Sequence, residues 1–232
     1  MDDTIEAYID RAQFTIDAAV YNADDFSIIS ALTYTPTGEI LAVGTRGPPG
    51  ALRLTAWLID PNSCTAVPGW PKSLANWSEG DDYKKTTSLG AAVGIDEDGN
   101  LIIAGNFLVD NKPQGYVALL NSTGSLLWEQ ASQVGDEITS VAAGRAQFSN
   151  RVFVGGSQRT SDNPVRTDGA VWVYIADGES VFIQPPTTLR SPFTPDEFDP
   201  DLQNLRSEWV RALVMQPSTG NVLAVGEREY AH

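Results

Sequence analysis

Asp96, Asp98 and Asn100 place oxygen-bearing side chains at alternate positions of one short segment, which is the spacing of ligands in calcium-binding loops. The rest of such a loop, a third acidic residue before a glycine and a distal glutamate, is missing. The same residues suit a plain hairpin turn, because Asp and Asn bond their own backbone and Gly99 accepts a positive φ. The sequence therefore leaves a calcium site and a turn as alternatives and indicates no other cofactor.

A second group of candidate residues is aromatic. Trp70, Trp77 and Tyr83 lie in the loop segment 68–84. Rings in such a loop stack on sugars or on a peptide, and loops on a rigid scaffold often carry binding. The alternative is that the rings pin the loop to the core. Under the first interpretation these three residues bind the ligand, and the partner is a protein or a carbohydrate.

The sequence contains few residues that are suited to catalysis. The single histidine, His232, is the last residue, and chain ends are usually mobile, so a serine or cysteine nucleophile lacks a positioned base. The acidic run 196–201 offers carboxylates for a cation or for glycoside hydrolysis, but no spacing places two of them across a cleft. We therefore expect no catalytic activity, and a glycan-active enzyme that uses these acidic-loop carboxylates is the alternative.

Charge and hydropathy exclude several partners. The 232 residues include 15 Lys and Arg against 30 Asp and Glu, a net charge of −15, so the basic field that nucleic acid requires is missing. No segment approaches the roughly 18 apolar residues of a membrane span, so we expect no membrane insertion. The first residues form no secretory signal, so export would need a signal outside this sequence. The lone Cys64 leaves the redox compartment open.

An internal repeat organises the elements that position these residues. An apolar strand, a turn with glycine and a second apolar strand ending in glycine occur at 30–44, 90–105 and 210–226, with a weaker copy at 140–156. Glycine in the turn supplies the positive φ of a tight hairpin. Each copy predicts a β-hairpin, and the four closing glycines are Gly44, Gly105, Gly156 and Gly226.

Each of the first three hairpins leads to a further pair of strands, which begins at 54–59, 116–120 and 170–175. Repeats of about 40 to 60 residues with four antiparallel strands are typical of propeller blades. We predict an all-β domain over 24–232, a β-propeller-like array of four-stranded antiparallel blades with three full repeats and a partial fourth. Propellers usually close with about 4 to 8 blades, so whether the ring closes within this chain stays open.

Two segments depart from the repeat. Within residues 1–23, apolar positions at helical spacing predict a short N-terminal helix over 3–12, followed by a strand. Between 184 and 200, five prolines and several acidic residues predict a long loop. Since a propeller meets its partners through loops on one face of the ring, we expect contacts at the loops 68–84 and 184–200.

One copy of the repeat shows its features most clearly. An acidic pair and a D-x-D-G-N turn precede an apolar strand that ends in Ala-Gly, and a later turn precedes Leu-Leu-Trp. These features occupy Asp96 to Gly105 and Thr123 to Trp128. The pattern resembles the bacterial cell-surface β-propeller repeats often labelled SBBP-type, over roughly residues 24 to 228. The resemblance implies a secreted or surface protein, without known catalysis, at an extracellular or cell-surface location. The residues themselves do not exclude the cytoplasm.

The N-terminal residues 5–21 look like the opening helix and strand of phospholipase D-type domains. That family needs an H-x-K motif, in which the histidine is the nucleophile. His232 has no lysine after it, so phospholipase D chemistry is not available to this chain alone. The stretch is then a remnant of such a domain or a coincidence of helix and strand.

The sequence as a whole predicts a non-catalytic binding or scaffold module of a bacterial secreted or surface protein, with an unidentified ligand. Two alternatives stay open. One is the enzyme described above, and the other is an incomplete segment of a larger propeller or phospholipase D-like protein without activity of its own. The sequence makes no prediction about the oligomeric state.

Overall fold

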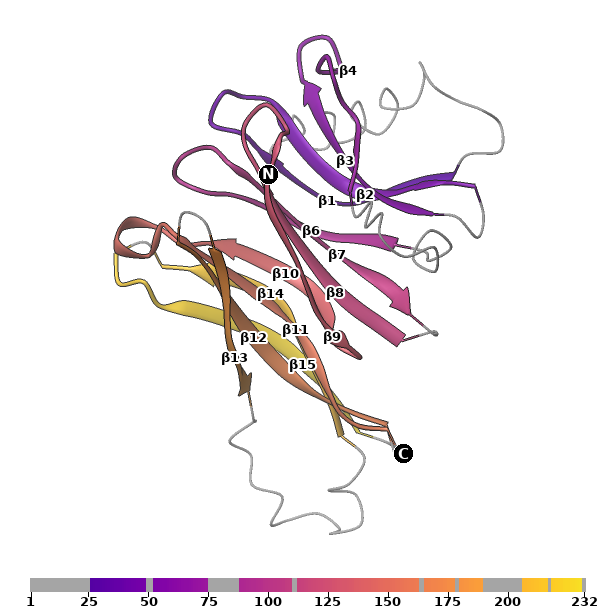
Figure 1. The fold of residues 1–232 in the computed structure, drawn as a ribbon, viewed down its shortest axis with the longest axis vertical. Helices are drawn as coiled ribbons and strands as arrows, with labels where there is room; N and C mark the ends of the chain where they lie inside the picture. Colours follow the sequence, from indigo (N-terminus) through magenta and orange to yellow (C-terminus); the bar gives the residue numbers. More distant parts are fainter. Residues whose placement is uncertain are drawn as a thin grey trace, which may run out of the picture.

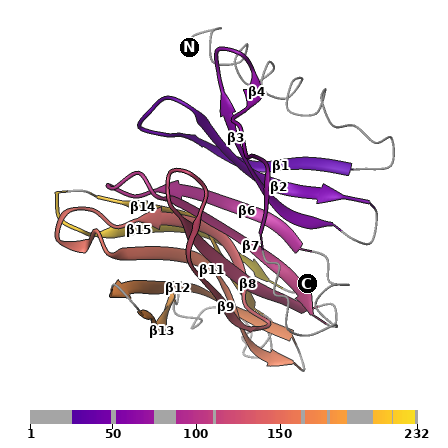
Figure 2. The same cartoon turned by 45° about the horizontal axis from the view of Figure 1, so that its top comes forward.

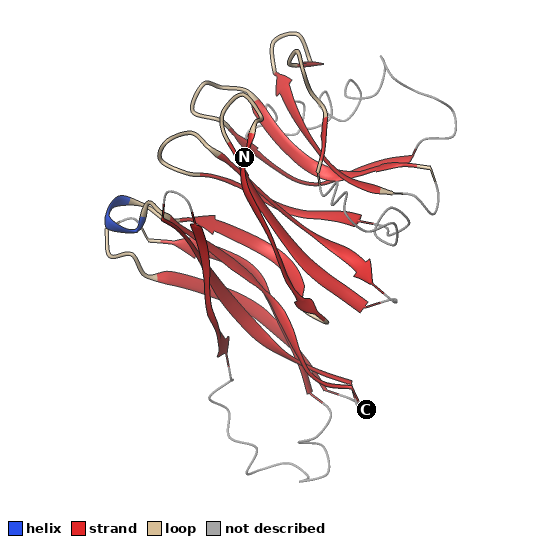
Figure 3. Ribbon diagram, in the orientation of Figure 1, coloured by secondary structure: helices blue, strands red, loops and turns tan. Residues whose placement is uncertain are grey.

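A computed structural model describes residues 26–48, 52–74, 88–109, 112–162, 165–177, 180–189, 206–216 and 218–230. These residues are β-strands and turns with one short 3-10 helix at Ala146–Phe148 (Figure 3). The prediction of an all-β protein is confirmed. The helix predicted at 3–12, with the rest of the predicted segment 1–23, lies outside the described residues.

The strands form three sheets, which follow one another along the molecule in both views (Figures 1 and 2). The first contains β1 (Phe26–Tyr34), β2 (Ile40–Gly47), β3 (Arg53–Asp60) and the short β4 (Thr65–Ala66) and β5 (Lys72–Ser73). The second contains β6 (Ser88–Ile95), β7 (Leu101–Val109), β8 (Lys112–Leu120) and β9 (Leu126–Val134). The third contains β10 (Glu137–Ala143), β11 (Arg151–Asp162), β12 (Val165–Asp177), β13 (Ser180–Leu189), β14 (Arg206–Met215) and β15 (Val222–Tyr230).

The four predicted hairpins are present as the antiparallel pairs β1–β2, β6–β7, β10–β11 and β14–β15. Their turn glycines Gly38, Gly99 and Gly220 have φ values of +98°, +79° and +73°, as tight hairpin turns require. We call β1, β6, β10 and β14 the leading strands. Each leading strand contacts the next one in chain order, so successive hairpins are neighbours in space.

A β-bulge interrupts every leading strand at the same place. The extra residues are Ser30, Ala91, Thr139 and Arg211, and each lies opposite a closing glycine of its hairpin. The bulge bends the strand and pushes a carbonyl group onto that glycine. A Cβ added to Gly44, Gly105, Gly156 or Gly226 would overlap the carbonyl oxygen of the residue two before the bulge: Ile28, Leu89, Glu137 or Trp209.

Two parts of the fold differ from the prediction. In the first sheet, the predicted fourth strand is replaced by two short strands, β4 and β5, which both pair with β3. In the third sheet, β13 runs through Pro185 and Pro186 to Leu189, so the start of the predicted loop 184–200 is strand. Prolines are tolerated there because, among the described strands, β13 pairs only with β12, and its register shifts at that point. Residues 190–200 lie outside the described residues.

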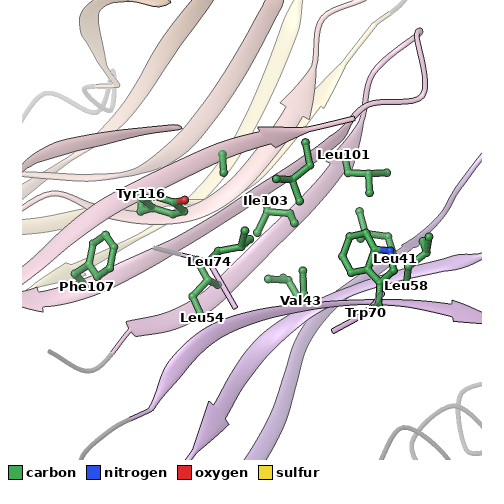
Figure 4. Packing of buried hydrophobic residues seen from close by; sticks show 13 residues of the cluster. Leu41, Val43, Leu54, Leu58, Trp70, Leu74, Leu101, Ile103, Phe107 and Tyr116 are labelled. Carbon is green, nitrogen blue, oxygen red and sulfur yellow. The ribbon is translucent and has the colours of Figure 1, made fainter. Parts of the chain in front are cut away.

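The main hydrophobic core lies between the first and second sheets (Figure 4). Leu41 and Val43 of β2 meet Leu101 and Ile103 of β7 there, all of them buried. A second core joins the second and third sheets, and a smaller one joins β10–β12 to β14–β15. Strands such as β2 and β7 are therefore apolar on both faces, as their sequences predicted.

The closing glycines generate the first testable prediction. Gly105→Ala is expected to destabilise the fold by about 1 to 3 kcal/mol, because the new methyl group overlaps the Leu89 carbonyl and the bulge must move. The measurement is the midpoint of urea unfolding. Gly94→Ala, in the same hairpin, is the control, since its Cβ would lie 3.4 Å from the nearest atom and meet ordinary contacts. Equal midpoints for the two variants would contradict the role of the close approach.

Candidate functional site

Trp70 is placed in the core and not on a ligand-binding surface. Its ring is buried with Leu41 and Leu58 (Figure 4). Lys72 Nζ lies 5.9 Å from the ring centroid. The ring also reaches the β8–β9 turn, where a Cβ on Gly124 would come within 2.7 Å of it. Trp70 therefore joins the first sheet to the second, the alternative role considered for it. Trp77 and Tyr83, which were predicted to bind with it, lie outside the described residues.

The structure uses the calcium candidates Asp96, Asp98 and Asn100 to build a turn. Asp96 Oδ1 accepts hydrogen bonds from the amides of Asp98 and Asn100, at 3.0 and 2.8 Å, and Asp96 Oδ2 accepts one from Asn100 Nδ2. Both carboxylate oxygens of Asp96 are thus occupied by the hairpin itself. Across the described part of the chain, no group of three His, Cys, Asp or Glu residues is arranged to hold a metal ion.

The residues considered for catalysis, the acidic run 196–201 and His232, lie outside the described residues. Among the described residues, Asp136 is an acidic residue that is buried, in the turn between β9 and β10. Burial raises the pKa of Asp136 to about 6, against hydrogen bonds from the Gln133 amide, the Ser132 hydroxyl and the Arg159 amide. These donors enclose the carboxyl group, so it serves the turn.

The same packing interface joins each hairpin to the next. Residues one and three before a closing glycine form what we call the front face of a hairpin, and residues two and four before it form the back face. Front-face Leu41 and Val43 pack on back-face Leu101 and Ile103. The pattern recurs between the second and third hairpins and between the third and fourth: Ile102 and Ala104 on Val152 and Val154, then Phe153 on Val222 and Ala224.

A polar side chain directly after the closing glycine bonds to the next leading strand. Thr45 Oγ1 accepts the amide of Gly90 at 3.3 Å. Asn106 Oδ1 accepts the amide of Ile138 at 2.7 Å, and Asn106 Nδ2 donates to the Ile138 carbonyl at 2.7 Å. Gly90 and Ile138 each directly precede the bulged residue of their leading strand. The amide hydrogen bonds that Thr45 and Asn106 accept therefore occupy the same position in successive repeats. These hydrogen bonds fix the register of one hairpin on the next.

The front face of the last hairpin is exposed. Leu223 and Val225 hold the front-face positions, and the cross-strand pairs with β14 add Ala212 and Val214. Val214, Leu223 and Val225 are 60%, 62% and 56% exposed, whereas the residues equivalent to Leu223 and Val225 in the earlier hairpins are buried. We call Ala212, Val214, Leu223 and Val225 the open face. It is the candidate functional site, because a row of apolar side chains on a sheet offers a contact surface to a partner.

Charged groups border the open face. Glu227 follows the closing glycine Gly226 and so occupies the position of Thr45 and Asn106. Its carboxylate accepts hydrogen bonds from the guanidinium of Arg211, the bulged residue of β14. The Arg211 guanidinium also lies 5.4 Å from the centroid of the Trp209 ring. The site thus has an apolar centre and an ion pair at its rim.

The open face and its polar neighbours were not among the predicted site residues. A signal for the polar contacts is present in the sequence, since Thr45, Asn106, Ser157 and Glu227 each follow a closing glycine. No such signal marks the open face. Leu223 and Val225 alternate with Val222 and Ala224 in the same way as the buried residues of the earlier hairpins. Exposure there depends on whether another strand packs over the hairpin.

Comparisons with known proteins place the chain by its fold. No protein-family model matches the sequence, and a comparison with curated proteins also finds no match. A protein of unknown function from Dyadobacter fermentans is similar in structure, with a TM-score of 0.60 and 12% identity. The match covers 90% of this chain and 64% of that one, so this chain spans less than two thirds of its length. At this identity the likeness concerns the fold alone.

Two further solved structures show weaker likeness. Sqt1 from Chaetomium thermophilum has a TM-score of 0.45 and 18% identity, over 71% of this chain and 36% of that one. An endo-arabinase from Bacteroides thetaiotaomicron has a TM-score of 0.38 and 14% identity, over 69% of this chain and 61% of that one. At these TM-scores neither likeness supports an inference about this chain. In the part of the chain that the structure describes, no helix has the length and apolar character to span a bilayer.

The inter-hairpin hydrogen bonds generate a second prediction. Asn106→Ala is expected to destabilise the fold by about 1 to 3 kcal/mol, because the Ile138 amide and carbonyl lose their partner at a packed interface. Urea unfolding measures the change. Asn150→Ala, at an exposed turn position, is the matched control and should stay within about 0.5 kcal/mol of wild type. An Asn106→Ala variant as stable as the control would show that the bond contributes nothing.

Asp136 generates a third prediction, on pH. Its pKa of about 6 in the folded state exceeds the ordinary value of 3.8, so protonation favours the folded state. The stability that Asp136 contributes is therefore lost as the pH rises through about 6 and regained toward 3.8. Between pH 7 and pH 5, the unfolding free energy of wild type should rise relative to that of Asp136→Asn. Parallel pH profiles for the two proteins would refute the assignment.

Proposed function

We propose that this protein is a non-catalytic binding or scaffold module, built as a propeller-like array, of a bacterial secreted or surface protein of the SBBP type. The blade arrangement is supported by the leading strands β1, β6, β10 and β14, which neighbour one another in chain order. It is supported further by the four-stranded second sheet and by the same bulge in every unit. In this interpretation each hairpin opens one blade.

The open face carries the proposal of binding. Exposed Val214, Leu223 and Val225 lie together on one face of the two-stranded hairpin. Burying them against a partner would remove apolar area from water. Each fully buried aliphatic side chain contributes on the order of 1.5 to 3 kcal/mol. The face carries no nucleophile, base or buried acid, so its chemistry suits contact and not reaction.

The function generates a fourth prediction. Immobilised wild-type protein should retain a partner from a bacterial cell-envelope extract, and Leu223→Glu should retain about tenfold less of it. The reason is that a carboxylate in the centre of the apolar face must be desolvated on binding. Mass spectrometry identifies the retained protein, and the purified partner is then retested for binding. Leu127→Glu is the control, because Leu127 is 51% exposed on β9, away from the open face.

Two results would contradict the proposed function. One is equal retention of the partner by wild type, Leu223→Glu and Leu127→Glu, which would remove the open face from binding. The other is the release of reducing sugars from cell-wall glycans by the wild-type chain, which would favour the enzyme alternative.

A further inference from the structure

In the described chain, a covered front face is covered by the leading strand of the next hairpin together with the back face of that hairpin. β6 lies against β1, β2 and β3, β10 lies against β6, β7 and β8, and β14 lies against β10, β11 and β12. The open face of β14 and β15 is the next surface in this series. Its natural occupant is therefore a leading strand of the same repeat.

The residues with which a leading strand covers its neighbour are set by the bulge. They are the residues two and four after it, and they all pack in the inter-sheet cores. The three pairs are Val93 and Ile95 on β6, Val141 and Ala143 on β10, and Leu213 and Met215 on β14. An occupant of the open face must present two apolar side chains at these positions.

The equivalent residues of β1 are uncovered. The bulged residue of β1 is Ser30, so these positions are Leu32 and Tyr34, which are 42% and 58% exposed. The back faces of β2 and β3 are buried at Ile40, Ala42 and Trp57, so β1 carries the free part of this surface. The chain thus holds an open front face on β14–β15 and, on β1, two exposed side chains at the positions with which a leading strand covers such a face.

We propose that the open face docks a second copy of this chain, whose β1 lies across β14 and β15 with Leu32 and Tyr34 on Leu223 and Val225. This rests on the proposed function and names the partner of the same site. Glu227 then holds the position from which Thr45 and Asn106 accept an amide. Ile29 of the second copy, the residue before its bulge, holds the position of Gly90 and Ile138.

The contact joins two different surfaces, so it is head to tail. Such a contact either closes when two copies each use both surfaces or continues into longer assemblies. The net charge of −15 on each copy opposes association, and this repulsion is screened by salt. The apolar contact itself does not depend on screening. Association should therefore be measured at an ionic strength of about 0.3 M.

Sedimentation velocity of the whole chain tests the proposal over about 1 to about 100 µM, a range that suits small interfaces. Wild type and the control Leu127→Glu are expected to sediment as a dimer or a longer assembly at the upper end. Leu223→Glu and Tyr34→Glu are each expected to sediment as monomers. At the lower end of this range, where wild type is a monomer as well, their thermal unfolding midpoints should match wild type, because both side chains are exposed in the monomer.

Mixing the two monomeric variants is the sharpest test. Leu223→Glu keeps an intact β1 and Tyr34→Glu keeps an intact open face, so an equimolar mixture should form a dimer with one contact. Wild type that stays monomeric overturns the proposal. So does a Leu223→Glu effect without a Tyr34→Glu effect, because the two open faces would then be meeting each other. If wild type is monomeric yet retains another protein through Leu223, the proposed function survives and the second copy is ruled out as its partner.

Discussion

The architecture depends on one close approach that recurs in every hairpin. A bulge in the leading strand brings a backbone carbonyl onto the Cα of the closing glycine, where a side chain would overlap it. The bend lets the strand lie across the preceding sheet while it stays paired within its own hairpin. The interface between the first two units is tight at this point, since a Cβ on Gly90 would lie 2.6 Å from the Gly44 carbonyl oxygen. Packing between units thus follows from backbone geometry, and side chains then fill the cores.

The polar residues after the closing glycines turn this packing into a specific register. Apolar faces alone tolerate sliding, but the amide before a bulge can be satisfied only when Thr45 or Asn106 lies opposite it. At the last hairpin the same position holds Glu227, which bonds to its own hairpin through Arg211. The last described hairpin therefore carries the apolar and polar positions of the repeat interface on an exposed face.

Much of the fold is predictable because its determinants are local. Alternating apolar residues, turn glycines and the closing glycines predict the four hairpins, and each lies where its sequence indicates. The burial of Trp70 is not determined by its neighbours in sequence, because its ring packs against Gly124 of the next sheet. The raised pKa of Asp136 is likewise not local, because it comes from burial, which hydrogen bonds from residues of β9 and β11 oppose. The exposure of Leu223 cannot be predicted from its own strand, because the sequences of covered and uncovered faces show the same alternation of apolar residues.

The attachment of the last hairpin has a consequence for the distribution of stability. β14 is joined to the rest of its sheet by the parallel pair Thr167 with Ser207, by the hydrogen bond from Thr139 Oγ1 to the Val210 carbonyl, and by the small core around Phe153 and Leu213. In a linear array, each unit is held by its nearest neighbours, so a terminal unit with one neighbour opens at a lower free energy than the interior. The amide hydrogens of β15 should therefore exchange with solvent through local opening of the last hairpin. Those of β7 and β8 should exchange only through global unfolding. A partner seated on β14 and β15 would act as a missing neighbour and bring the last hairpin into the same cooperative unit as the core.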